Sequence, residues 1–458
     1  MKIGLEVHCQ LLTKTKLFCG CRNDVSKEPN TLTCPTCLGM PGSKPRTNRK
    51  ATEYAMKIGL ALSCKFHKEA FFSRKSYFYP DMSKNFQITQ YELPFAREGC
   101  VVVNKKKIRI TRIQLEEDPA RLVHVGGLGG DYVLVDYNRS GTPLVEIVTE
   151  PDFSSPKEAR MFLDKLSSIL QYLGVFDPNI EGSMRCDANI SLESARVEVK
   201  NISGFKEVER ALNYEIVRQK NEIRRKGKVL RETRAWDDVA GVTRSMRLKE
   251  GEEDYGYIFD TDLPRITIEK EVIEEIKAAM PELPAQKISR YTKELKIPLE
   301  LSMSIVSEPD LAMMFEQVIE EIDPQLAAKW FAGEIKKTLN YSNLRMKGTG
   351  LEAKHLVSLL RMIENKQLTD RSAEMMLREI VTHPMDPGKL VAKRARIYDE
   401  SVLEPVVQKV IDQNPKTLMD YKSGKQEAFN FLVGQIMKQT EGRGDADTIR
   451  KILHKKIN

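Results

Sequence analysis

The chain has 458 residues, of which 41% are hydrophobic and 30% are charged, and its formal net charge at pH 7 is +8. This length has room for about three domains. No run of roughly eighteen apolar residues occurs, which excludes a membrane-spanning helix. The chain opens with MKIGLE and shows no apolar signal segment, so we expect a cytoplasmic protein. The positive charge is compatible with a nucleic-acid partner, although many other soluble proteins carry such a surplus.

Strands and helices are mixed in residues 1–290. Strands outnumber helices there and do not alternate strictly with them, which favours an α+β fold around a mixed or antiparallel sheet. The turn NRSGTP at 138–143 is expected to join two of the strands as a hairpin with a long loop. Alternation of apolar and polar residues predicts strands at 3–11, 107–115, 132–137, 144–149 and 184–192.

Two long helices are predicted between these strands. The first begins after Ser155, a favoured N-cap residue, with Pro156 at the first helical position. Gly174 closes this helix. The second covers about 206–225 and ends before Gly227.

The pattern changes after PELP at 281–284, beyond which almost every segment has helical periodicity. We therefore predict a cradle domain at 1–290, a helical domain at 291–396 and a small helical tail domain at 397–458. The predicted helices span 310–322, 324–339, 352–365, 370–381, 402–414, 415–422, 425–440 and 446–456.

Four of the eight cysteines lie within 19–37, as the pairs Cys19 with Cys21 and Cys34 with Cys37. Paired thiolates at this spacing can close a tetrahedron around zinc, and a closed set of four cysteines is typical of a structural site. The alternatives are two disulfides, which need an oxidising compartment, or free thiols in a core. The pairing favours a zinc knuckle.

A strand over 4–10 would place Glu6, His8 and Gln10 on one face. A carboxylate beside an imidazole suits metal binding or proton transfer. The alternative is a solvated strand face on which the histidine has no chemical role.

Two other polar segments could bind a cation. Glu116, Glu117 and Asp118 are consecutive acids at the end of a predicted strand. Clustered oxygen ligands are what Mg²⁺ requires, although an acidic surface turn would look the same. Asp187 and Asn189 alternate onto one face of a later strand, which places a carboxylate and an amide in line.

Basic and aromatic residues are interleaved in RKSYFYPD at 74–81. Arg74 and Lys75 could pair with phosphate, and Tyr79 could stack on a base. The alternative is a buried aromatic strand with a basic edge.

Several common motifs are missing. The chain has no GxxxxGK[ST] segment, so a nucleotide would have to bind without a Walker-type loop. The glycine-rich GGLGG at 126–130 lacks the lysine and is predicted to be a flexible turn. Neither a GxSxG elbow nor an HExxH helix is present.

Six motifs occur in a fixed order, and together they resemble the B subunit of the aspartyl/glutamyl-tRNA(Asn/Gln) amidotransferases, in the GatB/GatE family. The resemblance covers essentially the whole chain. No inserted synthetase-like domain follows the cradle, which favours the B type over the archaeal E type. The motifs are GLEVH at 4–8, YFYPD at 77–81, LEED at 115–118, NRSGTPLVEIV at 138–148, GSMRCDAN at 182–189, and YKSGK at 421–425 with FLVGQ at 431–435.

The resemblance implies a cradle that holds the kinase and transamidation site, then a helical domain and a YqeY-like tail that binds tRNA. It implies a ligase that phosphorylates the side-chain carboxyl of Glu-tRNA(Gln), Asp-tRNA(Asn) or both with ATP, after which ammonia displaces the phosphate. ATP, Mg²⁺ and structural Zn²⁺ are the implied cofactors. The implied partners in a heterotrimer are an amidase that acts as the glutaminase (the A component) and a small third protein (the C component).

The resemblance also implies site residues. Glu6, His8 and one or both of Glu116 and Glu117 are expected in the catalytic site, with Asp187 as a further candidate. The expected magnesium ligands are Glu6, His8 and Glu117. His8 or a carboxylate could keep ammonia unprotonated as a general base.

Contacts to nucleotide, phosphate or the tRNA 3′ end are expected from Arg74, Lys75, Tyr79 and Asn189. Relatives often read DYRYFP where this chain has DYGYIF at 254–259. Gly256 therefore puts in doubt any contact that the family makes through an arginine there.

Two other functions compete with this interpretation. One is a non-catalytic, zinc-containing tRNA-binding subunit, in which Glu6, His8 and Glu117 would be dispensable. The other is a free-standing zinc hydrolase that uses Glu6, His8 and Glu116. A hydrolase would need an open coordination position on its zinc, which four cysteines do not provide.

Overall fold

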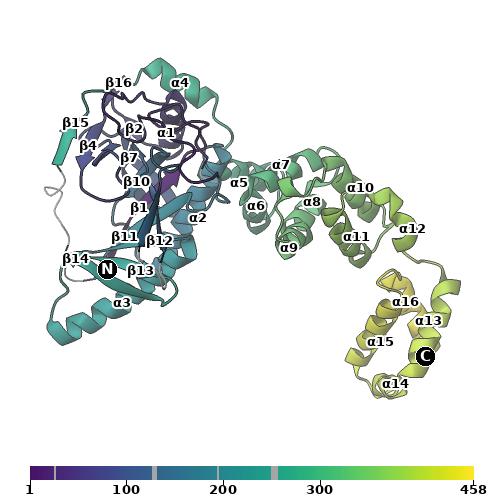
Figure 1. The fold of residues 1–458 in the computed structure, drawn as a ribbon. Helices are drawn as coiled ribbons and strands as arrows, with labels where there is room; N and C mark the ends of the chain where they lie inside the picture. Colours follow the sequence, from purple (N-terminus) through teal and green to yellow (C-terminus); the bar gives the residue numbers. More distant parts are fainter. Residues whose placement is uncertain (25–26, 126–131, 193–194, 249–255, 458) are drawn as a thin grey trace. The chain divides into compact units, whose positions relative to one another are not determined.

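A computed structural model describes the chain (Figure 1), and it divides into two compact units, Met1–Leu283 and Pro284–Asn458. The predicted turn at 126–130 and the first two residues of DYGYIF lie outside the described residues. No described helix combines the length and apolar character needed to cross a membrane. The described residues are 1–24, 27–125, 132–192, 195–248 and 256–457. The predicted domain limits at 290 and 396 stay predictions.

A nine-stranded sheet forms the centre of the first unit, in the order β14-β13-β12-β11-β1-β10-β7-β6-β2. Its neighbouring strands are antiparallel, apart from the parallel pair β12 and β13. This mixed sheet, followed by a helical second unit, confirms the predicted α+β class. The strands are β1 (Lys2–Gln10), β2 (Lys65–Phe66), β6 (Ala96–Val103), β7 (Lys106–Glu117), β10 (Pro143–Thr149), β11 (Met184–Ser191), β12 (Val197–Ser203), β13 (Glu232–Asp237) and β14 (Val242–Leu248).

Smaller elements complete the first unit. Strands β15, β4 and β5 form a three-stranded sheet, and β16 pairs with β3. The bounds are α1 (Arg49–Ala61), β3 (Glu69–Ala70), β4 (Ser73–Ser76), β5 (Phe86–Thr89), β15 (Gly256–Phe259), β16 (Ile266–Thr267) and α4 (Lys270–Ala278).

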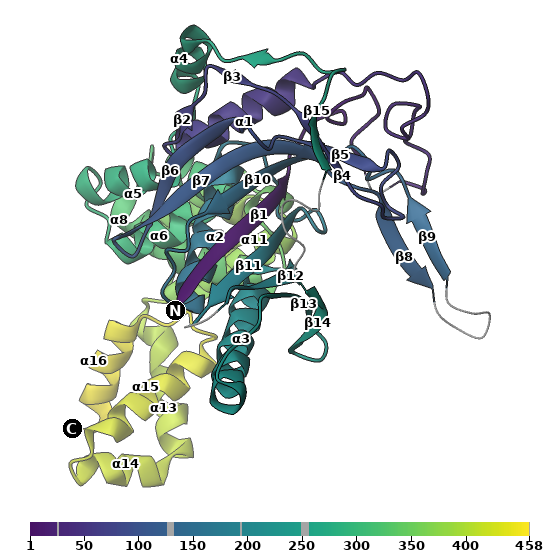
Figure 2. The ribbon, with the colours of Figure 1, turned by 90° about the vertical axis from the view of Figure 1, so that its left-hand side faces the viewer.

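The predicted hairpin across 138–143 is wrong. Strand β9 (Tyr132–Asp136) pairs with β8 (Arg121–Val125) in a separate ribbon, which extends away from the main sheet (Figure 2). Strand β10 pairs instead with β1 and β7. The turn leads from the ribbon into the sheet, and two backbone hydrogen bonds to Asp118 hold it there. Gly141 N donates to Asp118 O at 2.9 Å, and Asp118 N donates to Thr142 O at 2.9 Å.

Two long helices, α2 (Pro156–Tyr172) and α3 (Phe205–Lys226), pack against one face of the sheet (Figure 1). Both confirm the sequence prediction. Ser155 caps α2 by accepting a hydrogen bond from Glu158 N at 3.2 Å, and Gly227 ends α3 with φ 74°.

The alternation of β1 decides which residues this packing buries. Leu5, Val7 and Cys9 are at most 1% exposed and belong to the core that includes the apolar stripes of α2 and α3. Consecutive residues of a strand point to opposite faces. Glu6 and His8 therefore point to the face that these helices leave uncovered.

The second unit is helical, as predicted. The helix expected at 324–339 contains a π segment, Phe331–Ile335, between α8 and α9. The last four helices have a core of their own, which includes Leu403, Leu432 and Leu453. The helices are α5 (Pro284–Lys293), α6 (Leu299–Val306), α7 (Pro309–Val318), α8 (Pro324–Trp330), α9 (Lys336–Tyr341), α10 (Ala353–Glu364), α11 (Asp370–Thr382), α12 (Val391–Arg394), α13 (Glu400–Gln413), α14 (Pro415–Lys422), α15 (Gln426–Gln439) and α16 (Ala446–Ile457).

Candidate active site

The sheet face opposite α2 and α3 is polar along several strands. His8 lies opposite Glu146 of β10, and Glu146 lies opposite Gln114 of β7. Glu6 lies opposite Asp187 of β11. Directly opposed residues of antiparallel strands point to the same face, so four strands contribute to one polar surface.

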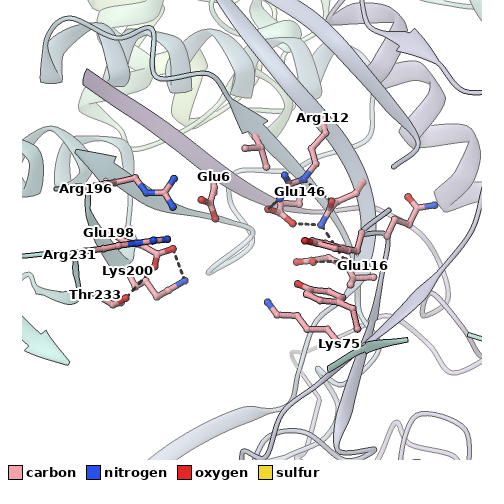
Figure 3. Close-up of a pocket in the computed structure, with 16 residues that line it drawn as sticks. Glu6, Lys75, Arg112, Glu116, Glu146, Arg196, Glu198, Lys200, Arg231 and Thr233 are labelled. Atoms are coloured by element: carbon pink, nitrogen blue, oxygen red, sulfur yellow. Dashed lines mark hydrogen bonds and ion pairs between the residues drawn. The ribbon is translucent and has the colours of Figure 1, made fainter. Parts of the chain in front are cut away.

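A cavity of about 280 Å³ opens on this surface (Figure 3). Glu6 lies between two walls, one that carries Glu198 and Arg231 and one that carries Glu116 and Glu146. The charged lining is balanced, with five cations and four carboxylates. They are Lys75, Arg112, Arg196, Lys200 and Arg231, with Glu6, Glu116, Glu146 and Glu198.

His8, Glu116 and Glu146 form the first acid cluster, and their ligand atoms lie within 4.8 Å of one another. His8 Nε2 is 3.3 Å from Glu116 Oε1. Gln114 Nε2 donates to Glu146 Oε2 at 2.5 Å, and Thr89 Oγ1 donates to Glu116 Oε2 at 3.2 Å. Both carboxylates are buried, so their neighbours hold them in place.

Glu6, Asp187 and Glu198 form the second acid cluster, with the same limit of 4.8 Å. Lys200 Nζ lies 2.8 Å from Asp187 Oδ2 and 3.3 Å from Glu198 Oε1. Asn189 Nδ2 donates to Glu6 Oε1 at 2.8 Å. Within the described part of the chain, the buried Asn189 Oδ1 has no hydrogen-bond partner, and Asn189 lines a second pocket, which shares Glu6 and Arg196 with the cavity.

Both clusters fit a hard divalent cation. Mg²⁺ takes six ligands at about 2.1 Å, mostly oxygens, and usually keeps water or phosphate oxygens among them. Each cluster offers three protein donors and leaves positions for such oxygens. The second cluster supplies only carboxylate oxygens, and the first adds one imidazole nitrogen.

The pKa values of the first cluster reflect its crowding. Burial lowers the pKa of His8, but the hydrogen bond and charge of Glu116, with the charges of Glu146 and Asp187, outweigh burial and raise it to about 9. Burial, then the charge of Glu116, raises the pKa of Glu146 to about 7. Burial opposes ionisation of Glu116 too, but the bond to His8 prevails and lowers its pKa. A bound cation would relieve the repulsion between the two carboxylates.

This crowding predicts a pH-dependent gain in stability for Glu146→Gln in EDTA. A carboxyl whose folded pKa is raised contributes stability that is fully present below its ordinary pKa of 4.5 and is lost as the pH rises through about 7. Glutamine does not ionise, so the variant keeps the free energy of unfolding that the wild type loses, which is about 3 kcal/mol at most. We expect its Tm to match the wild type near pH 4.5 and to exceed it at pH 8, in thermal melts across this range. A Tm difference that does not change with pH would contradict the raised pKa.

Glu117 does not join the cluster predicted for it. Its carboxylate pairs with Lys84 and accepts a hydrogen bond from Ile88 N at 3.0 Å. It alternates with Glu116 along β7, so the two side chains leave the strand on opposite faces. The predicted ligand set of Glu6, His8 and Glu117 is therefore not brought together: Glu6 and His8 belong to separate clusters, and Glu116 occupies the place expected for Glu117.

The predicted phosphate contacts divide between the cavity and other sites. Lys75 lines the cavity. Arg74 instead pairs with Asp260 at 2.8 Å and Asp262 at 2.9 Å, so it joins two segments of the first unit. Tyr79 is 58% exposed and does not line the cavity. This exposure contradicts the alternative of a buried aromatic strand at that position.

Several residues of the cavity are not among those predicted from the sequence. Glu146 lies inside the NRSGTPLVEIV motif, two residues along from Leu144 on the same face of β10, and this alternation could have revealed it. Glu198 and Lys200 alternate in VEVK, which reads like any surface strand. Arg196 and Arg231 precede strands that are far apart in sequence, and no local pattern links them.

Gly256, at the position where the family resemblance implies an arginine, lies close to this site. Gly256 of β15 pairs with Ser76 of β4, and the following residue, Tyr257, lines the cavity. Tyr257 stacks on Tyr91 with ring centroids 4.0 Å apart. The strand therefore supplies an aromatic surface to the cavity, without a cation at position 256.

The four cysteines of the predicted knuckle come together. Their Sγ atoms lie within 4.8 Å of one another, and none of the four is in a disulfide. Tetrahedral zinc with Zn–S bonds of about 2.3 Å places its sulfurs roughly 3.8 Å apart, so the set fits zinc. The fully buried Lys16 places its Nζ 3.6 Å from Cys37 Sγ, which brings a positive charge next to the thiols.

The chain is similar to known proteins along nearly its whole length. Residues 1–274 match the family model of the GatB/GatE catalytic domain, and residues 313–457 match that of the GatB domain. Proteins named as the B subunits of aspartyl/glutamyl-tRNA(Asn/Gln) amidotransferases are similar along their full length. The protein from Methanoregula boonei is 45% identical over 98% of this chain and 97% of its own. Those from Thermotoga maritima and Methanosarcina acetivorans are 42% and 43% identical, over 99% and 100% of this chain and 98% of their own length. The chain therefore belongs to the GatB/GatE family, as a relative of its amidotransferase B subunits.

Proposed function

We propose that this chain is the B subunit of a tRNA amidotransferase and that its cavity activates and amidates the side-chain carboxyl of Glu-tRNA(Gln), Asp-tRNA(Asn) or both. The observation that carries the proposal is that two carboxylates of each acid cluster, Glu116 with Glu146 and Glu6 with Glu198, line one cavity that also holds five cations. Two cation sites beside basic side chains suit phosphoryl transfer, which depends mainly on positioning and on neutralising charge.

The proposed chemistry has two steps. A carboxylate oxygen of the mischarged amino acid attacks the γ-phosphorus of ATP, and the bond from that phosphorus to the bridging oxygen of ADP breaks. Ammonia then attacks the acyl carbon, and the bond to the phosphate oxygen breaks. One proton leaves the nitrogen, so the products are the amide, ADP and phosphate. The phosphorylation is needed because phosphate leaves an acyl carbon far more readily than oxide does.

The residues of the cavity and of the two acid clusters have distinct parts in this proposal. His8, Glu116 and Glu146 would hold one Mg²⁺, and Glu6 with Asp187 and Glu198 would hold another. When bound, these ions would neutralise the charge that develops on the transferred phosphoryl group. Lys75 and Arg112 on one wall, and Arg196 and Arg231 on the other, would orient the phosphates. Tyr91 and Tyr257 offer a stacked aromatic edge.

Other parts of the proposal rest on the family. Ammonia would come from glutamine through the glutaminase component, and the small third component would complete a heterotrimer. The knuckle at 19–37 would bind structural Zn²⁺, and the tail at 397–458 would bind tRNA. These assignments describe a cytoplasmic enzyme of protein synthesis.

The test is conversion of Glu-tRNA(Gln) to Gln-tRNA(Gln) by this chain, purified with its glutaminase and small-component partners, with ATP and with ammonium as donor. We expect the wild type to form the amide, and Glu6→Ala and His8→Ala to lose the activity while they still bind tRNA. Ammonium makes the assay independent of the glutaminase site. Activity that survives both substitutions would move the chemistry to a partner and leave this chain as a non-catalytic tRNA-binding protein.

A further inference from the structure

A row of exposed cations lies on the outer side of α3, a helix that covers the sheet face opposite the cavity. Lys220, Arg224 and Arg225 are all exposed, and their spacing places them on one side of the helix. Asn221 and Val217 lie on the same side, with Val217 59% exposed. This stripe therefore presents cations, an amide and an apolar side chain to solvent.

The acids of this part of α3 are already neutralised. Glu215, which is fully buried, pairs with Arg218 at 2.8 Å and with Arg234 at 3.3 Å. Glu222 pairs with Arg218 at 2.5 Å and with Lys226 at 2.9 Å. The charge of these two acids is therefore matched by other cations, and it does not offset the outer stripe.

Other elements do not compensate the stripe either. Among the residues that the structure describes, no ion pair involves the three cations of the stripe or Lys228, which follows the helix. The three are Lys220, Arg224 and Arg225. Cations that repel one another in a row are costly to the free protein and favour an anionic partner.

The topology connects this stripe to the cavity. Strands β12 and β13 are parallel, and Val197 pairs with Glu232 at their beginning. The crossover helix α3 therefore returns the chain to the end of the sheet where β12 starts. Arg196 and Arg231 immediately precede the paired residues, and both line the cavity (Figure 3). Lys228 lies between the end of α3 and Arg231, so the chain passes from the stripe to the cavity wall around this end of the sheet.

We propose that this basic stripe, formed by Lys220, Arg224, Arg225 and Lys228, binds the phosphodiester backbone of the RNA whose 3′ end enters the cavity. The inference rests on the proposed function and goes beyond it by naming the surface that holds the RNA duplex. An RNA backbone presents regularly spaced negative charges, and exposed lysine and arginine side chains bind these by releasing counterions. The stripe contributes affinity and positioning, since phosphate contacts carry no sequence information.

The experiment measures the affinity of the purified heterotrimer for a short RNA hairpin with a single-stranded 3′ end, across a salt series. The test variant is Lys220→Gln/Arg224→Gln/Arg225→Gln. The matched control is Lys107→Gln/Lys157→Gln/Lys270→Gln, which removes the same charge from exposed positions on β7, α2 and α4. Neither variant alters a residue that lines the cavity.

We expect the stripe variant to bind at least ten-fold more weakly at low salt. The slope of the logarithm of the association constant against log salt concentration, which is negative, should become shallower by about 2, since each lost contact removes roughly 0.7–0.9. The control should retain the wild-type slope and affinity within about two-fold. Equal slopes for the two variants, with unchanged Tm, would overturn the inference and leave the stripe with a role only at the helix end. Amide formation by the stripe variant at saturating tRNA separates this outcome from a failure of the proposed function, because the cavity is intact.

Discussion

Glu116→Gln is expected to lower amide formation by about 10³-fold, whereas Glu117→Gln should retain it within about ten-fold. Glu116 faces His8 Nε2 at 3.3 Å inside the first acid cluster. Glu117, the next residue, pairs with Lys84 and bonds Ile88 N. The two substitutions remove the same charge from adjacent buried positions, so the comparison isolates the direction in which each side chain points.

Stability should change in the opposite order. Glu117→Gln leaves the nearly buried Lys84 without a charged partner, which costs about 3 kcal/mol. Glu116→Gln removes the carboxylate that pairs with His8, but it also removes a charge that raises the pKa of Glu146, so its Tm should fall less than that of Glu117→Gln. Thermal melts, Mg²⁺ titration by calorimetry and the ammonium-dependent assay measure these effects. Loss of activity in Glu117→Gln, with Glu116→Gln active, would reverse the site assignment.

The largest structural effect is expected for Cys34→Ser/Cys37→Ser. Residues 11–48 connect β1 to α1, and the described part of this segment contains only an isolated bridge between Thr15 and Arg22. Leu11, Leu17 and Phe18 hold the start of this segment in the core of the first unit, and a four-cysteine zinc site would stabilise the rest. Such sites are worth roughly 10–16 kcal/mol in small peptides. We expect the variant to lose its zinc and to melt at least ~10 °C lower, with zinc content measured by mass spectrometry.

A cysteine pair outside the knuckle provides the control. Cys64→Ser/Cys100→Ser changes two half-buried thiols and should retain about one zinc per chain. Zinc that remains bound in Cys34→Ser/Cys37→Ser would exclude the knuckle as the zinc site. A variant of the knuckle that loses zinc and yet melts like the wild type would show that the metal does not stabilise the segment.

Local patterns in the sequence determined much of this protein. The cap at Ser155 and the glycine at Gly227 set helix ends, because capping depends on residues within one turn. Alternation placed Glu6 and His8 on one face of β1, because neighbouring side chains of a strand point to opposite sides. The spacing of the cysteines brought four thiols together across a short loop. In each case the interacting residues lie close along the chain.

The tertiary structure decided everything that depends on the register between distant strands. Strand β7 pairs with β10 so that Glu146 lies opposite Gln114, and this register puts Glu116, two residues along, on the face of His8. The sequence, which displays only three consecutive acids, could not choose between Glu116 and Glu117. The second cluster likewise needs β12 to pair with β11, which brings Glu198 within reach of Glu6.

The same limit explains the wrong hairpin and the missed cations. Strand β9 pairs with β8 and not with β10. The alternation of apolar and polar residues along a strand does not encode which strand it pairs with. Arg196 and Arg231 meet because a parallel crossover returns the chain to the same end of the sheet. Periodicity and caps reflect contacts over a few residues, which a sequence displays directly. The site itself depends on contacts between strands far apart in the chain, and only the packed sheet fixes which of their faces coincide.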